Sequence, residues 1–296
     1  IYKDNQKITK IMVITDIVLI IISLVAVIFS TVVDIRLKEV PDWISYSLII
    51  SGIALRLLHA IIFIDWFYFL YGIFGLGATF ILGNILYRTN QWGGGDTKLL
   101  IGLGSTLATK PFFLPESKIP FLITLIMYIA LAGACYGIVW SSVLMSKNFK
   151  NFITEFKVVL KSGKIHMLQT MALAISLILI ATVLFVESTI TRIFILVFAL
   201  ILALYFYTFV AIKSVENTYF FKKIPIEKLV EGDWLAKDVH IKNKIVLNRK
   251  TIIEKKHIAM LKELNVKNIL IKEGIPFVPP FLIGMIMALL LGNPFF

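Results

Sequence analysis

Two aspartates stand apart from the other charged residues because each lies at the end of an apolar segment. Asp34 closes the first long segment, in STVVDIRLKEVPDWIS, and Asp96 follows Gly93, Gly94 and Gly95 in NQWGGGDTKLLIGLG. Charged residues within membrane segments are costly and often mark function. Two carboxyl groups that share a site cannot both ionise readily, so the pair carries one proton over a range of pH. Such a pair could work as acid and base, with one carboxylate activating water while its protonated partner polarises a carbonyl group.

The residues around Asp96 admit a functional and a structural interpretation. Glycine adopts backbone conformations closed to other residues and lets another backbone, such as an extended peptide, approach closely. Lys98 adds a positive charge two residues further on. In the structural alternative, Asp96 is only the N-cap of the next helix and Asp34 is an ordinary interfacial charge. The spacing alone leaves both interpretations open.

The predicted helix ends also suggest which carboxyl group holds the shared proton. Asp34 lies near the C-terminal end of its helix, where the helix dipole disfavours a carboxylate, whereas Asp96 lies at a helix start, where the dipole favours one. The sequence therefore predicts that Asp96 is the ionised member of the pair and Asp34 the protonated member.

The elements that must position these residues are membrane helices. The 296 residues are 58% hydrophobic and 16% charged, whereas soluble domains are about 45–50% apolar and about 25% charged. Several apolar segments are long enough to cross a bilayer, and a shorter one covers residues 99–109. We therefore predict an all-α polytopic membrane protein of about seven or eight helices. The long segments cover residues 11–33, 43–64, 66–87, 119–145, 167–186, 193–212 and 275–292.

The net charge of +12 is more typical here of cytoplasmic loops than of nucleic-acid binding. Lysines cluster in residues 147–164 and 213–272, and the positive-inside rule places both segments in the cytoplasm. Counting the crossings back places the loops 34–42 and 88–98 on that same side. We therefore expect Asp34 and Asp96 at the cytoplasmic face of a multi-pass protein whose surroundings are the lipid bilayer, with no nucleic-acid partner.

Residues 213–274 differ in kind from the rest of the chain. The alternation in DVHIKNKIVLNRKTI predicts a hairpin, EKKHIAMLKELN has helical spacing, and VKNILIKE is typical of a strand. We therefore predict a small cytoplasmic α+β insert between the membrane segments 1–212 and the C-terminal helix 275–296. Basic residues outnumber acidic ones in it by 14 to 8, which fits either a position near anionic lipid or an ordinary solvated surface.

The other charges of the membrane segments are expected to be peripheral. Asp16 lies near the outer end of the first segment. Arg56 and His59 lie late in the second segment, where their side chains are expected to extend outward to the interface.

Three motifs resemble one family of membrane proteases. GGGD at 93–96 matches the Gly-x-Gly-Asp signature of intramembrane aspartyl proteases, and its continuation TKLL resembles the type IV prepilin peptidases in particular. In that family an apolar-Pro-polar triplet follows the first catalytic aspartate, as VPD at 40–42 follows Asp34. GIPFVPPFLIG at 274–284 is similar to the closing Ile-Pro-Phe-x-Pro-Phe segment of the family, with one extra proline.

The resemblance implies a membrane aspartyl endopeptidase whose protease core covers 1–212 and is completed by 275–296. Its substrates would be precursors of pilin-like or archaeal flagellin-like proteins with class III signal peptides, cut at the cytoplasmic face after a short basic leader. No metal or organic cofactor is implied. Because Cys135 is the single cysteine, the chain lacks paired Cys-x-x-Cys motifs and resembles the shorter archaeal preflagellin and prepilin peptidases. The implied catalytic residues are Asp34 and Asp96, in an active-site loop with Gly93, Gly94, Gly95 and Lys98.

Two alternatives stay open. A protease like presenilin or signal peptide peptidase would share the aspartate pair but would cut within the bilayer. Against it, Asp34 and Asp96 lie at helix ends and no Tyr-Asp pair precedes the glycines. A cation-coupled transporter could use the two aspartates to bind its ion, but the sequence shows no repeat with interrupted helices in matching halves.

Overall fold

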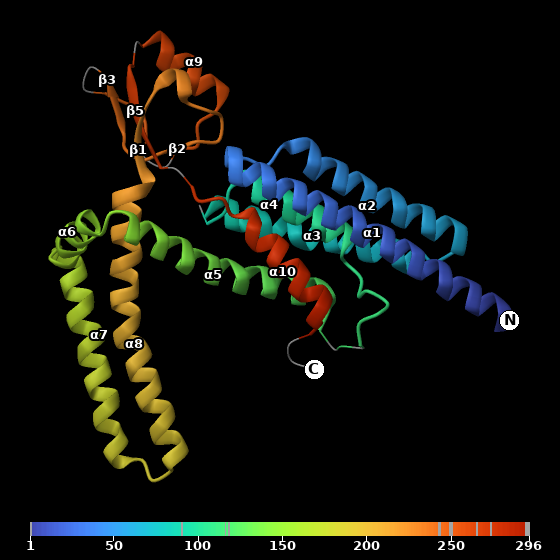
Figure 1. Cartoon of the computed structure of the whole chain (residues 1–296), viewed down its shortest axis with the longest axis horizontal. Coiled ribbons are helices and arrows are strands. Elements are labelled where there is room, and N and C mark those ends of the chain that lie inside the picture. The colour runs from blue at the N-terminus through green and yellow to red at the C-terminus, as the bar shows by residue number, and fades with distance from the viewer. Residues whose placement is uncertain are drawn as a thin grey trace. The chain divides into compact units, whose positions relative to one another are not determined.

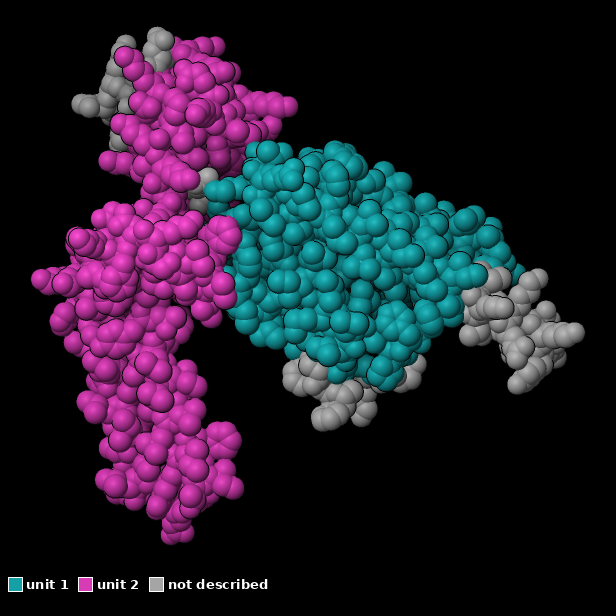
Figure 2. All heavy atoms as spheres, viewed as in Figure 1, with its two compact units in different colours: residues 1–137, 274–296 teal, residues 138–273 magenta. Residues whose placement is uncertain are grey.

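The described part of the computed structural model divides into two compact units, one formed by residues 1–137 with 274–296 and the other by 138–273 (Figure 2). The predicted insert over 213–274 lies almost entirely within the second unit, and its status as a separate domain stays a prediction. The structure describes residues 2–89, 91–115, 117, 119–241, 244–248, 251–264, 266–272 and 274–293.

The first unit is a bundle of helices around a short central one (Figure 1). The central helix is α4 (Gly94–Thr106), and nine of its 13 residues are buried. It packs chiefly against α2 and α3. The surrounding helices are α1 (Tyr2–Leu37), α2 (Asp42–Phe63), α3 (Trp66–Arg88), the first part of α5 (Phe121–Lys147) and α10 (Val278–Leu291).

Glycines let the backbones of α3 and α4 approach each other closely. A methyl group on Gly75 would collide with the carbonyl oxygen of Gly104, and one on Gly104 would collide with that of Gly75. Small residues have this function in many membrane helix pairs, where close van der Waals packing drives association. The C-terminal part of the short helix that carries Asp96 is therefore packed closely against α3.

The predicted fold class, a polytopic helical membrane protein, is confirmed. Among the described residues, six helices are long and apolar enough to cross a membrane. The two other predicted segments are the shorter helices α4 and α10, which have 13 and 14 residues. The six candidate spans are Val13–Leu37, Asp42–Phe63, Trp66–Arg88, Phe121–Lys147, Ile165–Phe185 and Thr189–Phe220.

The second unit combines helices with two small sheets. Its helices include the end of α5, α6 (Phe149–Leu160), α7 (Gly163–Thr182), η1 (Val183–Phe185), α8 (Thr189–Val215), η2 (Glu216–Phe220), η3 (Ile226–Lys228) and α9 (Lys255–Glu263). The larger sheet has the antiparallel order β1–β5–β2, formed by Phe221–Pro225, Asn268–Lys272 and Trp234–Leu235.

The predicted hairpin is present as the antiparallel pair β3 (Val239–Ile241) and β4 (Lys244–Leu247). Residues 242–243, which join these strands, lie outside the described residues. The predicted closing strand is β5 and the predicted helix is α9. Leu261 of α9 and Ile269 and Ile271 of β5 are buried in one apolar core, which makes this part of the unit a small α+β structure.

Glu216 connects the membrane helix α8 to the sheet that follows it. Its carboxylate accepts hydrogen bonds from Lys213, at 2.9 Å, and from Lys272 in β5, at 2.8 Å. The first residue of β1, Phe221, pairs with Lys272. Both ends of the α+β part are therefore fixed next to the end of α8.

Candidate active site

Asp34 lies in the last turn of α1 and is almost fully buried, with 5% of its surface exposed. The helix ends at Leu37, because Lys38 adopts a left-handed conformation with φ of 59°. The backbone N–H of Val278 donates a hydrogen bond of 2.9 Å to the Asp34 carboxylate. Val278 is the first residue of α10, so the C-terminal segment reaches an aspartate 244 residues earlier in the chain.

Asp96 is the third residue of α4 and lies outside the six candidate spans. Its carboxylate accepts a hydrogen bond of 3.2 Å from the backbone N–H of Gly93. Burial, and after it the negative charge of Asp34, raise the pKa of Asp96 to about 7. The structure therefore brings the two predicted aspartates together as an electrostatically coupled pair.

The predicted order of protonation is not supported by this environment. The start of α4 does supply an N–H group to Asp96, as expected, but the loss of solvation outweighs it, so the pKa of Asp96 rises instead of falling. Asp34 is buried as well, but it accepts a hydrogen bond from the N–H of Val278, a partner that its own helix end did not reveal. A hydrogen bond donated to a carboxylate stabilises its charged form. Because the pair titrates as a unit, the relevant quantity is its dominant microstate.

The glycine loop works through close approach and not through unusual backbone angles. Gly93 has an extended conformation with φ of −72°, and α4 already begins at Gly94. None of the three loop glycines is among the described glycines with positive φ. A methyl group on Gly95 would lie 2.9 Å from Cβ of Val40. The expectation of special conformations is therefore wrong here, and the close neighbour is a residue of the loop after Asp34.

The structural alternative is correct about one hydrogen bond. Asp96 does accept a backbone N–H at the start of its helix, although the N-cap position is taken by Gly93. This contact satisfies one of the N–H groups that every helix start leaves unpaired. It does not explain why Asp34, a second carboxyl group, lies close enough to affect the pKa of Asp96.

Lys98 connects the start of α4 to the start of α2 and does not turn back over the aspartates. Its ammonium group lies 2.6 Å from the carboxylate of Asp42 and 5.7 Å from the centre of the Tyr46 ring. The start of α4 is therefore linked twice to the segment that follows Asp34, by this ion pair with Asp42 and by the close approach of Gly95 to Val40.

An aromatic cluster joins the glycine loop to α10. The ring of Trp92 lies 5.7 Å from that of Phe277 and 5.2 Å from that of Phe281. Such separations are typical of favourable ring contacts. Trp92 and Val278 were not predicted as site residues, although Trp92 directly precedes the glycines and Val278 lies in the Pro-rich motif 274–284.

A second polar cluster lies at the other end of α4, where the sequence predicted side chains that extend outward. Arg56 is instead fully buried. Its guanidinium donates to the carbonyl oxygens of Ser105 and Thr106, both at 2.9 Å, to that of Tyr68 at 3.0 Å, and to the hydroxyl of Thr109 at 3.0 Å. The prediction failed because the partners of Arg56 are the last carbonyls of a helix about 50 residues later in the chain.

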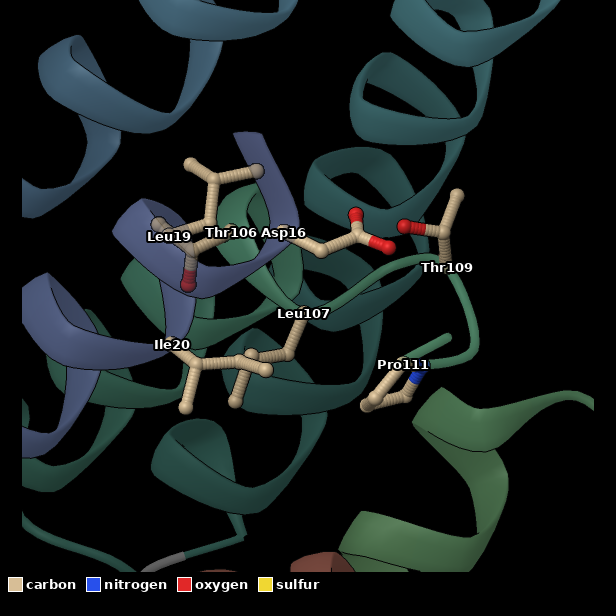
Figure 3. Close-up of a pocket in the computed structure, with 7 residues that line it drawn as sticks. All are labelled: Asp16, Leu19, Ile20, Thr106, Leu107, Thr109 and Pro111. Carbon is tan, nitrogen blue, oxygen red and sulfur yellow. The ribbon is translucent and has the colours of Figure 1, made fainter. Parts of the chain in front are cut away.

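Asp16 belongs to the same cluster. Its carboxylate accepts a hydrogen bond of 2.7 Å from the hydroxyl of Tyr68, and it lines a small pocket with Thr109, towards which its carboxyl group points (Figure 3). His59 is also buried, with a ring nitrogen 3.0 Å from the hydroxyl of Thr15. The expectation that Arg56 and His59 extend to the interface is therefore wrong.

Comparison with known proteins supports the resemblance of the motifs. Residues 19–142 match the model of the type IV leader peptidase family. The chain is 34% identical over 85 residues to a preflagellin peptidase of Methanococcus maripaludis. This alignment covers 29% of this chain and 36% of that protein. It is 25% identical over 156 residues to the prepilin peptidase EppA of Methanothermobacter thermautotrophicus. This alignment covers 49% of this chain and 40% of that protein. The matches thus span two fifths or less of these curated relatives.

The segment that matches the family contains Asp34, the glycine loop and Asp96. It ends before the α+β part and before α10. The resemblance inferred from the sequence motifs is therefore confirmed over the part of the chain that carries both aspartates.

Proposed function

Because residues 19–142 match the model of the type IV leader peptidase family, we propose that the protein is a membrane aspartyl endopeptidase. It removes the short basic leader peptide of pilin-like or archaeal flagellin-like precursors. The observation that carries this proposal is the coupled pair of carboxyl groups: Asp34 and Asp96 come from different helices, and the charge of one raises the pKa of the other. Two carboxyl groups that share one proton are the arrangement that aspartic proteases use.

We assign the base to Asp34 and the acid to Asp96. The assignment is supported by the N–H of Val278, which stabilises a carboxylate at Asp34, and by the raised pKa of Asp96. Asp34 accepts a proton from water as the water oxygen attacks the carbonyl carbon of the substrate. Asp96 donates a hydrogen bond to the carbonyl oxygen and gives its proton to the leaving amine when the C–N bond breaks, and the proton that Asp34 took from water leaves the pair with one proton again.

The location of the pair suits a substrate that is itself a membrane helix. Asp34 lies in the last turn of a candidate span and Asp96 at the start of a short buried helix. A precursor helix in the bilayer presents the start of its apolar segment at that depth, with its basic leader outside the hydrocarbon region. We place this face in the cytoplasm because the lysine-rich segments 147–164 and 213–272 favour that orientation.

The test is cleavage of a purified precursor by the full chain in lipid vesicles. Asp34→Asn and Asp96→Asn each keep the shape and hydrogen bonding of the side chain but cannot exchange a proton. We expect each variant to lose about 10²–10⁴-fold in cleavage rate, the usual contribution of acid–base catalysis, while it stays folded in membranes. Glu227→Gln, which changes an exposed carboxylate far along the chain, serves as the control and keeps full activity. Substantial cleavage by either folded Asp→Asn variant removes that residue from the pair.

A further inference from the structure

The short helix α6 lies between two candidate membrane spans. Phe121–Lys147 precedes it and Ile165–Phe185 follows it, so the 17 residues from 148 to 164 must connect two crossings at one membrane surface. One side of α6 is anchored within its own unit, because Phe152 and Val159 are buried and Val159 packs in an apolar cluster with Phe206 and Val210 of α8. The helix therefore has a fixed orientation with respect to α8.

Three lysines share another side of this helix. Lys150, Lys157 and Lys161 are spaced by seven and four residues, which is the spacing of one face of an α-helix. All three are exposed. Among the described residues, none of the three forms an ion pair. We call these three residues the lysine stripe.

The stripe has no acidic counterpart on α6. Glu155 is the only acidic residue between 147 and 164, and its carboxylate accepts a hydrogen bond of 2.8 Å from the side-chain amide of Asn217. Next to Lys150, Phe149 is 60% exposed. An exposed aromatic ring beside a row of lysines is the composition of helices that lie in the membrane interface.

We propose that the lysine stripe is a binding surface for anionic lipid headgroups. The lysines contact the phosphates of the leaflet that surrounds the junction between α5 and α7, and Phe149 enters the boundary of the acyl chains. Lipid is the partner that the charge and the location favour, because the helix lies at the bilayer surface and carries uncompensated positive charge. This inference does not depend on the peptidase activity.

The experiment counts the lipids that stay bound to the full-length protein. The protein is purified in mild detergent, mixed with equal amounts of phosphatidylglycerol and phosphatidylcholine, and examined by native mass spectrometry at low and high salt. We expect wild type to retain phosphatidylglycerol preferentially and to lose the preference at high salt. Each lysine removed is expected to weaken this binding about fivefold, so Lys150→Gln/Lys157→Gln/Lys161→Gln abolishes the preference.

Two further variants make the outcome specific. Lys255→Gln/Lys256→Gln/Lys262→Gln removes the same charge from exposed positions of α9 and is expected to behave like wild type. Lys150→Arg/Lys157→Arg/Lys161→Arg keeps the charge and is expected to keep the preference. Thermal unfolding of each variant establishes that it is folded. The proposal is overturned if wild type shows no preference for phosphatidylglycerol, if the stripe variant keeps it, or if the α9 variant loses it equally.

Discussion

The two ends of α4 meet the same physical demand in opposite ways. A helix of 13 residues is about 20 Å long, and both of its ends leave backbone groups without partners inside the helix. At the C-terminal end, Arg56 donates to the carbonyls of Ser105 and Thr106, and the carboxylate of Asp16 lies in the same cluster. At the N-terminal end, Asp96 accepts a hydrogen bond from Gly93, but the charge that acts on its pKa is that of a second carboxyl group, Asp34.

This difference distinguishes charges that stabilise the fold, around Arg56, from charges that can exchange a proton, at Asp34 and Asp96. The cluster around Arg56 contains opposite charges and donors matched to acceptors, so each charged group lowers the cost of burying the other. The pair at the other end contains like charges, which raises the cost of ionising both and leaves one proton to be exchanged. Perturbed carboxyl groups of this kind are candidates for function, whereas matched pairs are usually structural.

The largest effect that tests this comparison is expected at Arg56. Arg56→Gln removes a buried positive charge. The carboxylate of Asp16 then lacks an opposite charge in its cluster, and the last carbonyls of α4 lose the guanidinium donors. Removing one partner of a buried ion pair costs about 3–5 kcal/mol; because Arg56 donates to neutral groups and Asp16 accepts from Tyr68, we expect a loss up to this size in the free energy of unfolding, measured in detergent or nanodiscs. Because Asp16 then lacks compensation, Arg56→Gln/Asp16→Asn is expected to recover part of the loss.

The distinction between a structural and a catalytic end of α4 is contradicted if Arg56→Gln abolishes cleavage without loss of stability. We expect the cleavage rate per folded molecule to change far less than the stability. A variant that stays as stable as wild type but is inactive would mean that both ends of α4 contribute chemistry.

The contrast between the two ends also shows what the sequence could reveal. The helices and the two aspartates were predictable, because apolar length and short motifs are local properties of the chain. The hydrogen bond from Val278 to Asp34 and the contacts of Arg56 with Ser105 and Thr106 were not, because they join residues 244, 49 and 50 positions apart. The rule that a long cationic side chain extends to the membrane interface assumes that it lies on a lipid-facing helix surface. Arg56 instead faces α4.

The next effect concerns the close approach at the N-terminal end. Gly95→Ala adds a methyl group 2.9 Å from Cβ of Val40, so the loop after Asp34 must move away from α4. Because displacements of about 1 Å at a site can cost about 10²-fold in rate, we expect a loss of about 10- to 100-fold in cleavage rate with little loss of stability. Gly94→Ala is the matched control, since its methyl group meets only the Tyr87 ring at 3.6 Å, an ordinary contact. Gly95→Ala/Val40→Gly should restore activity, and a failure to do so would point to another cause.

A third effect is a dependence of stability on pH that arises from Asp96 at the N-terminal end of α4. The pKa of Asp96 is raised from 3.8 to about 7 in the folded protein. The folded state therefore binds more protons than the unfolded state between these values, and stability falls as pH rises through this window. Asp96→Asn removes the effect, so it should stabilise the protein at pH 8 by at least about 1 kcal/mol, the equivalent of roughly one pKa unit, and have little effect near pH 4. For wild type, cleavage should decline above about pH 7, where Asp96 loses its proton. Equal stabilisation at both pH values would show that Asp96 does not hold the proton.

The smallest effect is expected at Lys98, which lies in the first turns of α4, two residues after Asp96, but outside the aspartate pair. Its ion pair with Asp42 is short, at 2.6 Å, but the two side chains are 36% and 56% exposed. Water and salt therefore screen it, and exposed pairs contribute about 0.2–1 kcal/mol. We expect Lys98→Met to lower the free energy of unfolding by no more than this, and to slow cleavage by less than about fivefold, the rate equivalent of 1 kcal/mol. A double-mutant cycle with Asp42→Asn measures the pair itself. If the interaction energy is small but Lys98→Met reduces cleavage more than tenfold, Lys98 acts on the aspartates or on the substrate, and the chemical end of α4 extends beyond Asp34 and Asp96.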